Sequence, residues 1–192
     1  MFLPVWVALC ALAGGCALVR SGASKMIAPV ASQLSQGFLR EGDLELAREG
    51  SPAFLLMLDA LAETHPDNPA ILLAAAEAQL AYATSFVDRA QKERSKAMYL
   101  KAKTYGLQAL SRNRRFARAR HGASQDDFVR ALCGFKKKDA GALLTTATAW
   151  VMWIIASSDS PAALGEMPRV LALMDRVRTL DPGLRNGGVD LF

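Results

Sequence analysis

Few side chains in this sequence could carry out catalysis. The only two histidines, His65 and His121, lack cysteine or histidine neighbours at the spacing of a metal site, and we expect both at the surface. Adjacent Asp126 and Asp127 would point in different directions on a helix, so capping explains them better than acid–base chemistry. Cys133 has no basic activator nearby in the sequence and is expected to be a small core residue. The sequence therefore predicts no enzyme, no cofactor and no metal site.

One cysteine, Cys16, has a context that predicts covalent modification. Small residues, Ala-Gly-Gly, precede it, as in the lipobox at which bacterial signal peptides are cleaved and the thiol accepts diacylglycerol. Residues 1–15 carry no charge, and as a helix they would be about 22 Å long, too short for a hydrocarbon core of about 30 Å. We predict a signal peptide over residues 1–15 and a lipid anchor on Cys16 at the periplasmic face of a bacterial membrane. The alternative is an apolar first helix that packs on the domain and buries Cys16.

The composition predicts that the rest of the chain is helical. Hydrophobic residues make up 52% of the sequence and aromatic residues only 7%, and the abundance of alanine and leucine favours closely packed helices. Residues 16–42 are expected to form a tether and a first helix. Residues 43–192 are expected to form one domain of helical repeats, which no intramolecular disulfide can stabilise once Cys16 is acylated.

Capping residues followed by proline mark the expected helix starts. Ser51-Pro52 and Asn68-Pro69 each combine an N-cap with proline at the first helical position. Further helices are expected over residues 95–111, 124–133, 140–157 and 161–180, with Ser124 and Asp139 as caps and with Lys96, Lys101 and Lys103 facing outward. Paired helices separated by such signals predict an all-α fold of degenerate tetratricopeptide-like repeats, an α-solenoid or helical bundle.

Basic residues are concentrated in one region. Between residues 89 and 120 there are eleven Lys or Arg and one acid, although the formal net charge of the whole chain is only +5. The densest part contains Arg112, Arg114, Arg115, Arg118 and Arg120. These side chains form either a patch for an acidic partner or anionic lipid, or an ordinary solvated helix face. The scarcity of aromatic residues between them disfavours nucleic acid as the partner.

Large aromatic residues mark the expected apolar helices. Tyr82 and Phe86 lie in an alanine-rich segment, and Trp150 and Trp153 lie in the uncharged segment 140–157. Such residues commonly fill a core. They are also our candidates for lining a channel for a hydrophobic ligand, because apolar cavities need few polar groups.

The order of these segments resembles the TatT family, the T-component lipoproteins associated with tripartite ATP-independent periplasmic (TRAP) transporters. The resemblance rests on the segments 58–69, 70–87, 99–110, 146–150 and 174–182 and on Asn186-Gly187-Gly188. It implies an all-helical periplasmic lipoprotein that assembles as a homotrimer with pores and partners a solute-binding protein handling a hydrophobic ligand. Family members continue with further helices after the Asn-Gly-Gly turn, so we expect this sequence to lack its last repeat.

These observations predict a non-catalytic accessory of a TRAP-type uptake system that binds its solute-binding protein and a hydrophobic small molecule. The alternative is an envelope-assembly adaptor that binds a protein or peptide on its helical-repeat surface. A co-purified lipophile would favour the first function, and a bound polypeptide with an empty cavity would favour the second.

Overall fold

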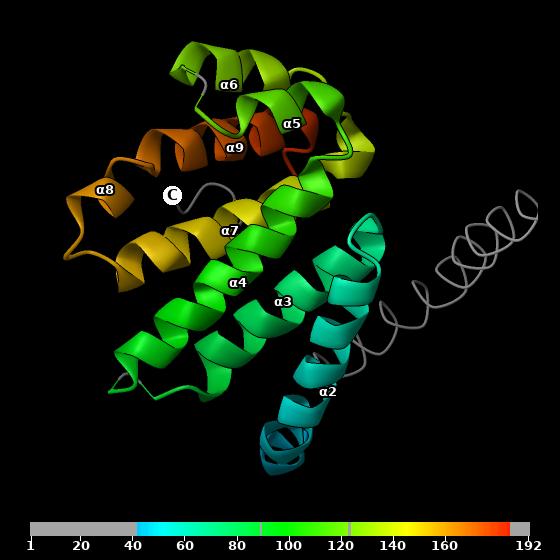
Figure 1. Ribbon diagram of the computed structural model, residues 1–192, viewed down its shortest axis with the longest axis vertical. Helices are drawn as coiled ribbons and strands as arrows, with labels where there is room; N and C mark the ends of the chain where they lie inside the picture. Colours follow the sequence, from blue (N-terminus) through cyan, green and yellow to red (C-terminus); the bar gives the residue numbers. More distant parts are fainter. Residues whose placement is uncertain (1–41, 89, 123, 185–192) are drawn as a thin grey trace, which may run out of the picture.

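The computed structural model describes residues 42–88, 90–122 and 124–184, and every regular element in these ranges is a helix (Figure 1). The predicted all-α fold is confirmed. The signal peptide over residues 1–15, the lipidation site Cys16, the tether up to residue 41 and the turn at residues 186–188 lie outside the described residues. The helices are α2 (Leu44–Thr64), α3 (Pro69–Phe86), α4 (Lys92–Leu110), α5 (Arg114–Ala119), α6 (Gln125–Leu132), the 3-10 turn η1 (Lys137–Asp139), α7 (Ala140–Ala156), α8 (Pro161–Leu164) and α9 (Met167–Leu180).

The long helices pack one against the next in an elongated array. α2 packs against α3, α3 against α4, α4 against α7, and α7 against α9. The short helices α5 and α6 pack against each other, and α6 packs against α9. Figure 1 shows α5 and α6 at one end of the array and α2 at the other. Helices in the middle of the array therefore bury two faces, as the repeat pattern predicts.

Helix α2 begins before the position predicted from Ser51-Pro52. Its N-cap is Asp43, whose Oδ1 accepts hydrogen bonds from the amides of Glu45 at 3.0 Å and Leu46 at 3.1 Å. Pro52 lies inside the helix, and the Ser51 hydroxyl donates to the Ala47 carbonyl in place of capping. The prediction of a start at Ser51 is wrong. A serine before a proline can also lie inside a helix, where burial of the helix face outweighs the backbone hydrogen bond that the proline cannot donate.

Two other predicted caps are confirmed. Asn68 caps α3, its Oδ1 accepting from the amides of Ala70 and Ile71, and Pro69 follows at the first helical position. Ser124 caps α6, its Oγ accepting from the Asp127 amide at 3.1 Å. These side chains satisfy amide groups that have no partner within their helices.

The interior divides into two clusters of different composition. The cluster among α2, α3, α4 and α7 is dominated by alanine and includes Leu58, Ile71 and Ala102, each with no exposed surface. The cluster among α4 to α7 and α9 is richer in aromatic residues and includes Phe116, Phe128 and Trp150. Small side chains let helix axes approach closely, whereas rings fill wider spaces.

Helices α4 and α7 come very close to each other at Gly106 of α4 and Thr146 of α7. A Cβ built on Gly106 would lie 2.5 Å from Oγ1, 3.0 Å from Cβ and 3.1 Å from Cα of Thr146. Gly106 is needed here for the space that it leaves, because no side-chain carbon fits at that distance from the neighbouring backbone.

The last predicted helix is interrupted. Residues 161–180 form two helices, α8 and α9, joined through Gly165 and Glu166. Pro168 cannot donate to a carbonyl one turn earlier, so it begins a helix more readily than it continues one. This break brings Glu166 to the region between the two helices, where it contacts α4 and α7. Helix α5, at the basic segment, was not predicted from the sequence.

Residues Lys137–Ala156, comprising η1 and α7, are long and apolar enough to cross a membrane by length and mean hydropathy alone. Within the fold, 61% of their most apolar stretch is buried. Because α7 packs against α3, α4 and α9, burial in the protein accounts for its apolar composition.

Candidate functional site

Lys103 of α4 lies between the two tryptophans of α7. Its Nζ is 3.7 Å from the ring centroid of Trp153 and 4.7 Å from that of Trp150. Lys103 is only 8% exposed, so the prediction that it faces outward is wrong. It is four residues after Tyr99 and three before Gly106, both buried, and this helical spacing could have placed it on the inner face.

Half-buried Glu166 completes this cluster, which we call the Lys103 cluster (Lys103, Trp150, Trp153 and Glu166). Oε2 of Glu166 accepts from Lys103 Nζ at 2.5 Å and from Trp150 Nε1 at 2.6 Å. Burial lowers the pKa of the Lys103 ammonium, and Glu166 offsets part of that effect. Two indole faces and a carboxylate thus replace the water that the ammonium loses.

The two tryptophans differ in their remaining hydrogen-bonding capacity. Trp150 is 3% exposed and stacks edge-on against Phe128, with ring centroids 6.3 Å apart. Trp153 is half-buried, and its Nε1 is buried without a hydrogen-bond partner among the described residues. The indole donor of Trp153 is therefore unsatisfied among the described residues, whereas that of Trp150 has its partner.

The other two candidate aromatics lie at the end of α3. The rings of Tyr82 and Phe86 are 5.5 Å apart between centroids and tilted by 54°. Arg94 of α4 stacks over Tyr82 at 5.8 Å, and Arg48 of α2 stacks over Phe86 at 5.7 Å. No ring contact among the described residues joins this pair to the tryptophans. The structure therefore arranges the four channel candidates as two pairs.

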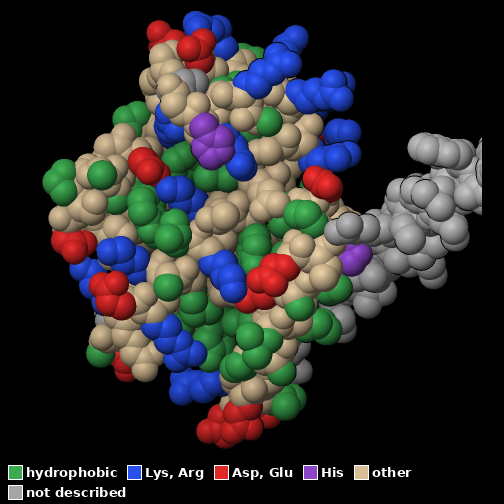
Figure 2. Space-filling model, in the orientation of Figure 1, with side chains coloured by type: hydrophobic (Ala, Val, Ile, Leu, Met, Phe, Trp, Pro, Cys, Tyr) green, Lys and Arg blue, Asp and Glu red, His purple; other side chains and the backbone are tan. Residues whose placement is uncertain are grey.

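The five predicted arginines lie around two hollows near α5. Arg115 and Arg118 line one of about 650 Å³ between α5 and α6, together with Arg130. Arg112, Arg114 and Arg120 line a second of about 290 Å³, near Asp67. Figure 2 shows Lys and Arg side chains gathered over the end of the molecule where Figure 1 places α5 and α6.

Arg120 is the most engaged of these five. Its Nη1 donates to Ser111 Oγ at 3.0 Å and its Nε to His121 Nε2 at 2.6 Å. The other four are exposed, and none of them forms a salt bridge with another of the described residues. No salt bridge within the described part of the chain therefore neutralises their charge.

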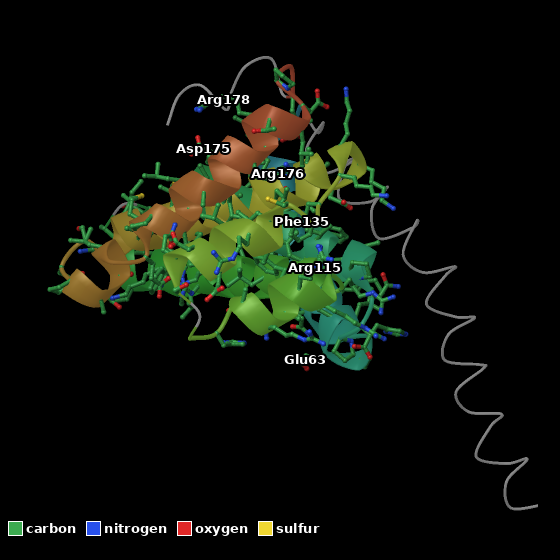
Figure 3. The ribbon with its side chains drawn as sticks, turned by 90° about the horizontal axis from the view of Figure 1, so that it is seen from above. Glu63, Arg115, Phe135, Asp175, Arg176 and Arg178 are labelled. Atoms are coloured by element: carbon green, nitrogen blue, oxygen red, sulfur yellow. The ribbon has the colours of Figure 1, made fainter. Side chains whose placement is uncertain are left out.

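Cys133 lies at the surface. Its Sγ is 3.8 Å from the Val129 carbonyl oxygen, and its side chain lines the larger hollow, so the prediction of a core residue is wrong. Arg176 of α9 secures this turn by donating through Nη2 to the Phe135 carbonyl at 2.6 Å and the Cys133 carbonyl at 3.2 Å (Figure 3). Guanidinium groups favour the carbonyl end of a helix, here the end of α6.

A buried carboxylate that the sequence analysis missed joins α2, α3 and α4. Asp59 accepts from Gln79 Nε2, with both oxygens at 3.1 Å, from Tyr105 Oη at 3.0 Å, and from Lys101 Nζ at 2.6 Å. Burial and the bond to Asp59 raise the pKa of the Tyr105 hydroxyl. The sequence signal that could have revealed it is the position of Asp59 on the apolar face of α2, since an acid that is buried there needs partners.

The two histidines differ in their exposure and contacts. His121 is exposed, and half-buried His65 ends α2 with Nδ1 2.9 Å from Thr64 Oγ1. Among the described ranges, no three His, Cys, Asp or Glu side chains are grouped so as to hold a metal ion.

A family model described as TAtT, TRAP transporter T-component, matches residues 40–192. The chain belongs to this family. Comparison with curated proteins found no match. The resemblance inferred from the order of the segments is thus confirmed.

Membership defines the general role of the protein. A T-component is an accessory component of a TRAP transport system, so this chain has an accessory role in TRAP transport and is associated with the bacterial envelope. The match begins at residue 40 and therefore includes every described helix of this T-component. Both the Lys103 cluster and the arginines around α5 lie within the matched region.

Proposed function

We propose that this T-component is a non-catalytic lipoprotein that holds a TRAP solute-binding protein at the membrane and takes part in uptake of a hydrophobic ligand. The family match over residues 40–192 carries the proposal. In it, Cys16 bears the lipid anchor on the periplasmic face, the protein assembles as a homotrimer, and the helical-repeat surface contacts the solute-binding protein.

The aromatic pairs supply candidate contacts for the ligand. Trp153 and Phe86 are half-buried, so part of each ring is open to a ligand. Apolar ligands gain most from rings that bury large areas. Tyr82, whose ring contacts that of Phe86, and Trp150 are more deeply buried.

The first test is native mass spectrometry of the protein extracted gently from its own cell envelope. We expect a trimer that carries diacylated Cys16, added small-molecule mass and a bound solute-binding protein. A Cys16→Ala variant should lose the acyl mass and leave the membrane fraction. An unacylated monomer without ligand or solute-binding protein would contradict the proposal, and a tightly bound unrelated polypeptide without small-molecule mass would favour an envelope-assembly adaptor.

A pair of matched variants tests the ligand contacts. Phe86→Leu should reduce the amount of co-purified lipophile, whereas Phe135→Leu, which also replaces a ring but in the cluster near α6, should leave it unchanged. If both variants retained the same amount of lipophile, Phe86 would not be a ligand contact. Circular dichroism on both proteins separates loss of ligand from loss of fold.

A further inference from the structure

The groove between α5 and α6 has a surplus of positive charge. Arg115 and Arg118 lie three residues apart on α5 and therefore on one face of that helix. Together with Arg130 of α6 they line a hollow of about 650 Å³. The groove is lined by Arg115, Arg118, Ala119, Asp127, Arg130, Ala131 and Cys133.

The single carboxylate that lines the groove is already engaged. Asp127 accepts from Ser124 Oγ at 2.8 Å and from Arg130 Nη2. These interactions, the one with Ser124 being the larger, lower the pKa of the Asp127 carboxyl and keep it ionised. Asp127 can thus offset the charge of Arg130, but Arg115 and Arg118 form no salt bridge with any described residue.

The form of the groove favours one kind of anionic partner. Guanidinium groups bind carboxylates through two parallel hydrogen bonds. Ala119, Ala131 and Cys133 provide small side chains in the hollow, leaving room for the methylenes of an inserted acidic side chain. A planar layer of lipid headgroups would meet the rim and leave the hollow unfilled, and the Asp127 carboxylate would repel it.

We propose that this groove binds an acidic segment of a protein partner, whose carboxylates pair with Arg115 and Arg118. The spacing of one helical turn suits acids three or four residues apart on a partner helix. Cys133 then lies beneath the bound segment. The proposal concerns a partner of this chemistry and holds whether or not that partner is a solute-binding protein.

The test uses the full chain in detergent and a fluorescein-labelled helical peptide of glutamate and alanine, with binding followed by fluorescence anisotropy at low salt. Arg115→Glu combined with Arg118→Glu should weaken binding about tenfold or more. The matched control reverses Lys92 and Lys96, near the start of α4, with the same change in net charge, and should change affinity less than about twofold. Equal weakening by both pairs would show diffuse attraction and overturn the proposal.

Two further measurements distinguish this groove from other binding modes. Replacing both arginines with lysine keeps the charge but removes the paired hydrogen bonds, so affinity should fall by about threefold to fivefold. Bound peptide should also slow maleimide labelling at Cys133, assigned by mass spectrometry. If saturating peptide did not slow the labelling of Cys133, the peptide would bind elsewhere, and the proposal that it binds in this groove would be refuted.

A vesicle experiment tests the competing anionic surface. Vesicles of phosphatidylcholine with phosphatidylglycerol should bind the wild-type chain and the Arg115→Glu, Arg118→Glu variant to similar extents. If the double variant lost vesicle binding but kept peptide binding, the arginines would dock on lipid, and the proposal would be wrong. Failure of the wild-type chain to bind the peptide would also overturn it, without bearing on TRAP-associated function.

Discussion

Replacing Gly106 with alanine tests the close contact between α4 and α7. The added Cβ would lie 2.5 Å from Oγ1 of Thr146, a separation that carbon does not adopt, and 3.1 Å from its backbone Cα. Thr146 could rotate its hydroxyl away, but that hydroxyl donates to the Ala142 carbonyl at 2.8 Å. The short distances to Cβ and Cα would remain after rotation, so the helices must also move apart.

The magnitude follows from three contributions. Overpacking costs about 1–3 kcal/mol, and loss of the Thr146 hydrogen bond costs about 1 kcal/mol. Alanine offsets about 1 kcal/mol because it favours the helix more than glycine does. We therefore expect the Gly106→Ala variant to lower the free energy of unfolding by about 2 kcal/mol, measured by urea denaturation with circular dichroism on the full chain.

A second glycine provides the control. A Cβ on Gly141, in the first turn of α7, would meet no atom within 4 Å, so Gly141→Ala should stabilise the protein by up to about 1 kcal/mol. Adding Thr146→Ala removes only the Oγ1 contact and should relieve part of the Gly106→Ala penalty. If Gly106→Ala were as stable as Gly141→Ala, the contact between α4 and α7 would not be tight, and our packing account would be refuted.

Three other predictions concern buried polar groups. Burial lowers the folded-state pKa of Lys103, so above that pKa the unfolded chain binds more protons than the folded chain, and the free energy of unfolding should rise with pH up to about 10.4, by at most about 1.4 kcal/mol per pH unit. A Lys103→Met variant, measured by urea denaturation from neutral pH upward, should lack this rise. If the stabilities of the variant and the wild-type chain changed in parallel with pH, the prediction would be contradicted. The pKa of Tyr105 is raised, so the folded chain keeps its proton above pH 10 and stability should fall there; Tyr105→Phe should remove that fall, which denaturation at high pH would detect. Asp59→Ala should cost about 3 kcal/mol, because Tyr105 and Gln79 lose a buried charged acceptor while Lys101, more exposed, returns to water; an unchanged urea midpoint would show that the Asp59 network contributes little.

Local sequence signals predicted the fold where a single interaction decides the structure. Asn68 before Pro69 leaves few alternatives to a helix start, and the alanines of α3 permit close neighbours. The same signal failed at Ser51-Pro52, since burial of Ala47 before the proline and of Phe54 and Leu58 after it extends α2 through it. Whether a proline begins or interrupts a helix depends on tertiary packing, which short patterns do not contain.

The candidate site depended more strongly on distant contacts. Lys103 was expected on the outer face of its helix together with Lys96 and Lys101, but lysine can be buried where it has partners. Its partners come from α7 and from Glu166, 63 residues later in the chain, and the break between α8 and α9 is needed to place that carboxylate. The arginines were found from composition alone, but only the α5–α6 packing divides them between two hollows.

The placement of these groups lets stability and partner binding be altered separately. The Lys103 cluster and the Asp59 network both include residues of α4, whose packing against α3 and α7 connects much of the array. Variants there will alter stability together with any effect on a ligand, so a loss of function in them is ambiguous. Arg115 and Arg118, by contrast, are exposed on the six-residue helix α5, and their replacement removes no described hydrogen bond of a side chain. A loss of partner binding in their variants, with an unchanged unfolding midpoint, therefore reports on recognition itself.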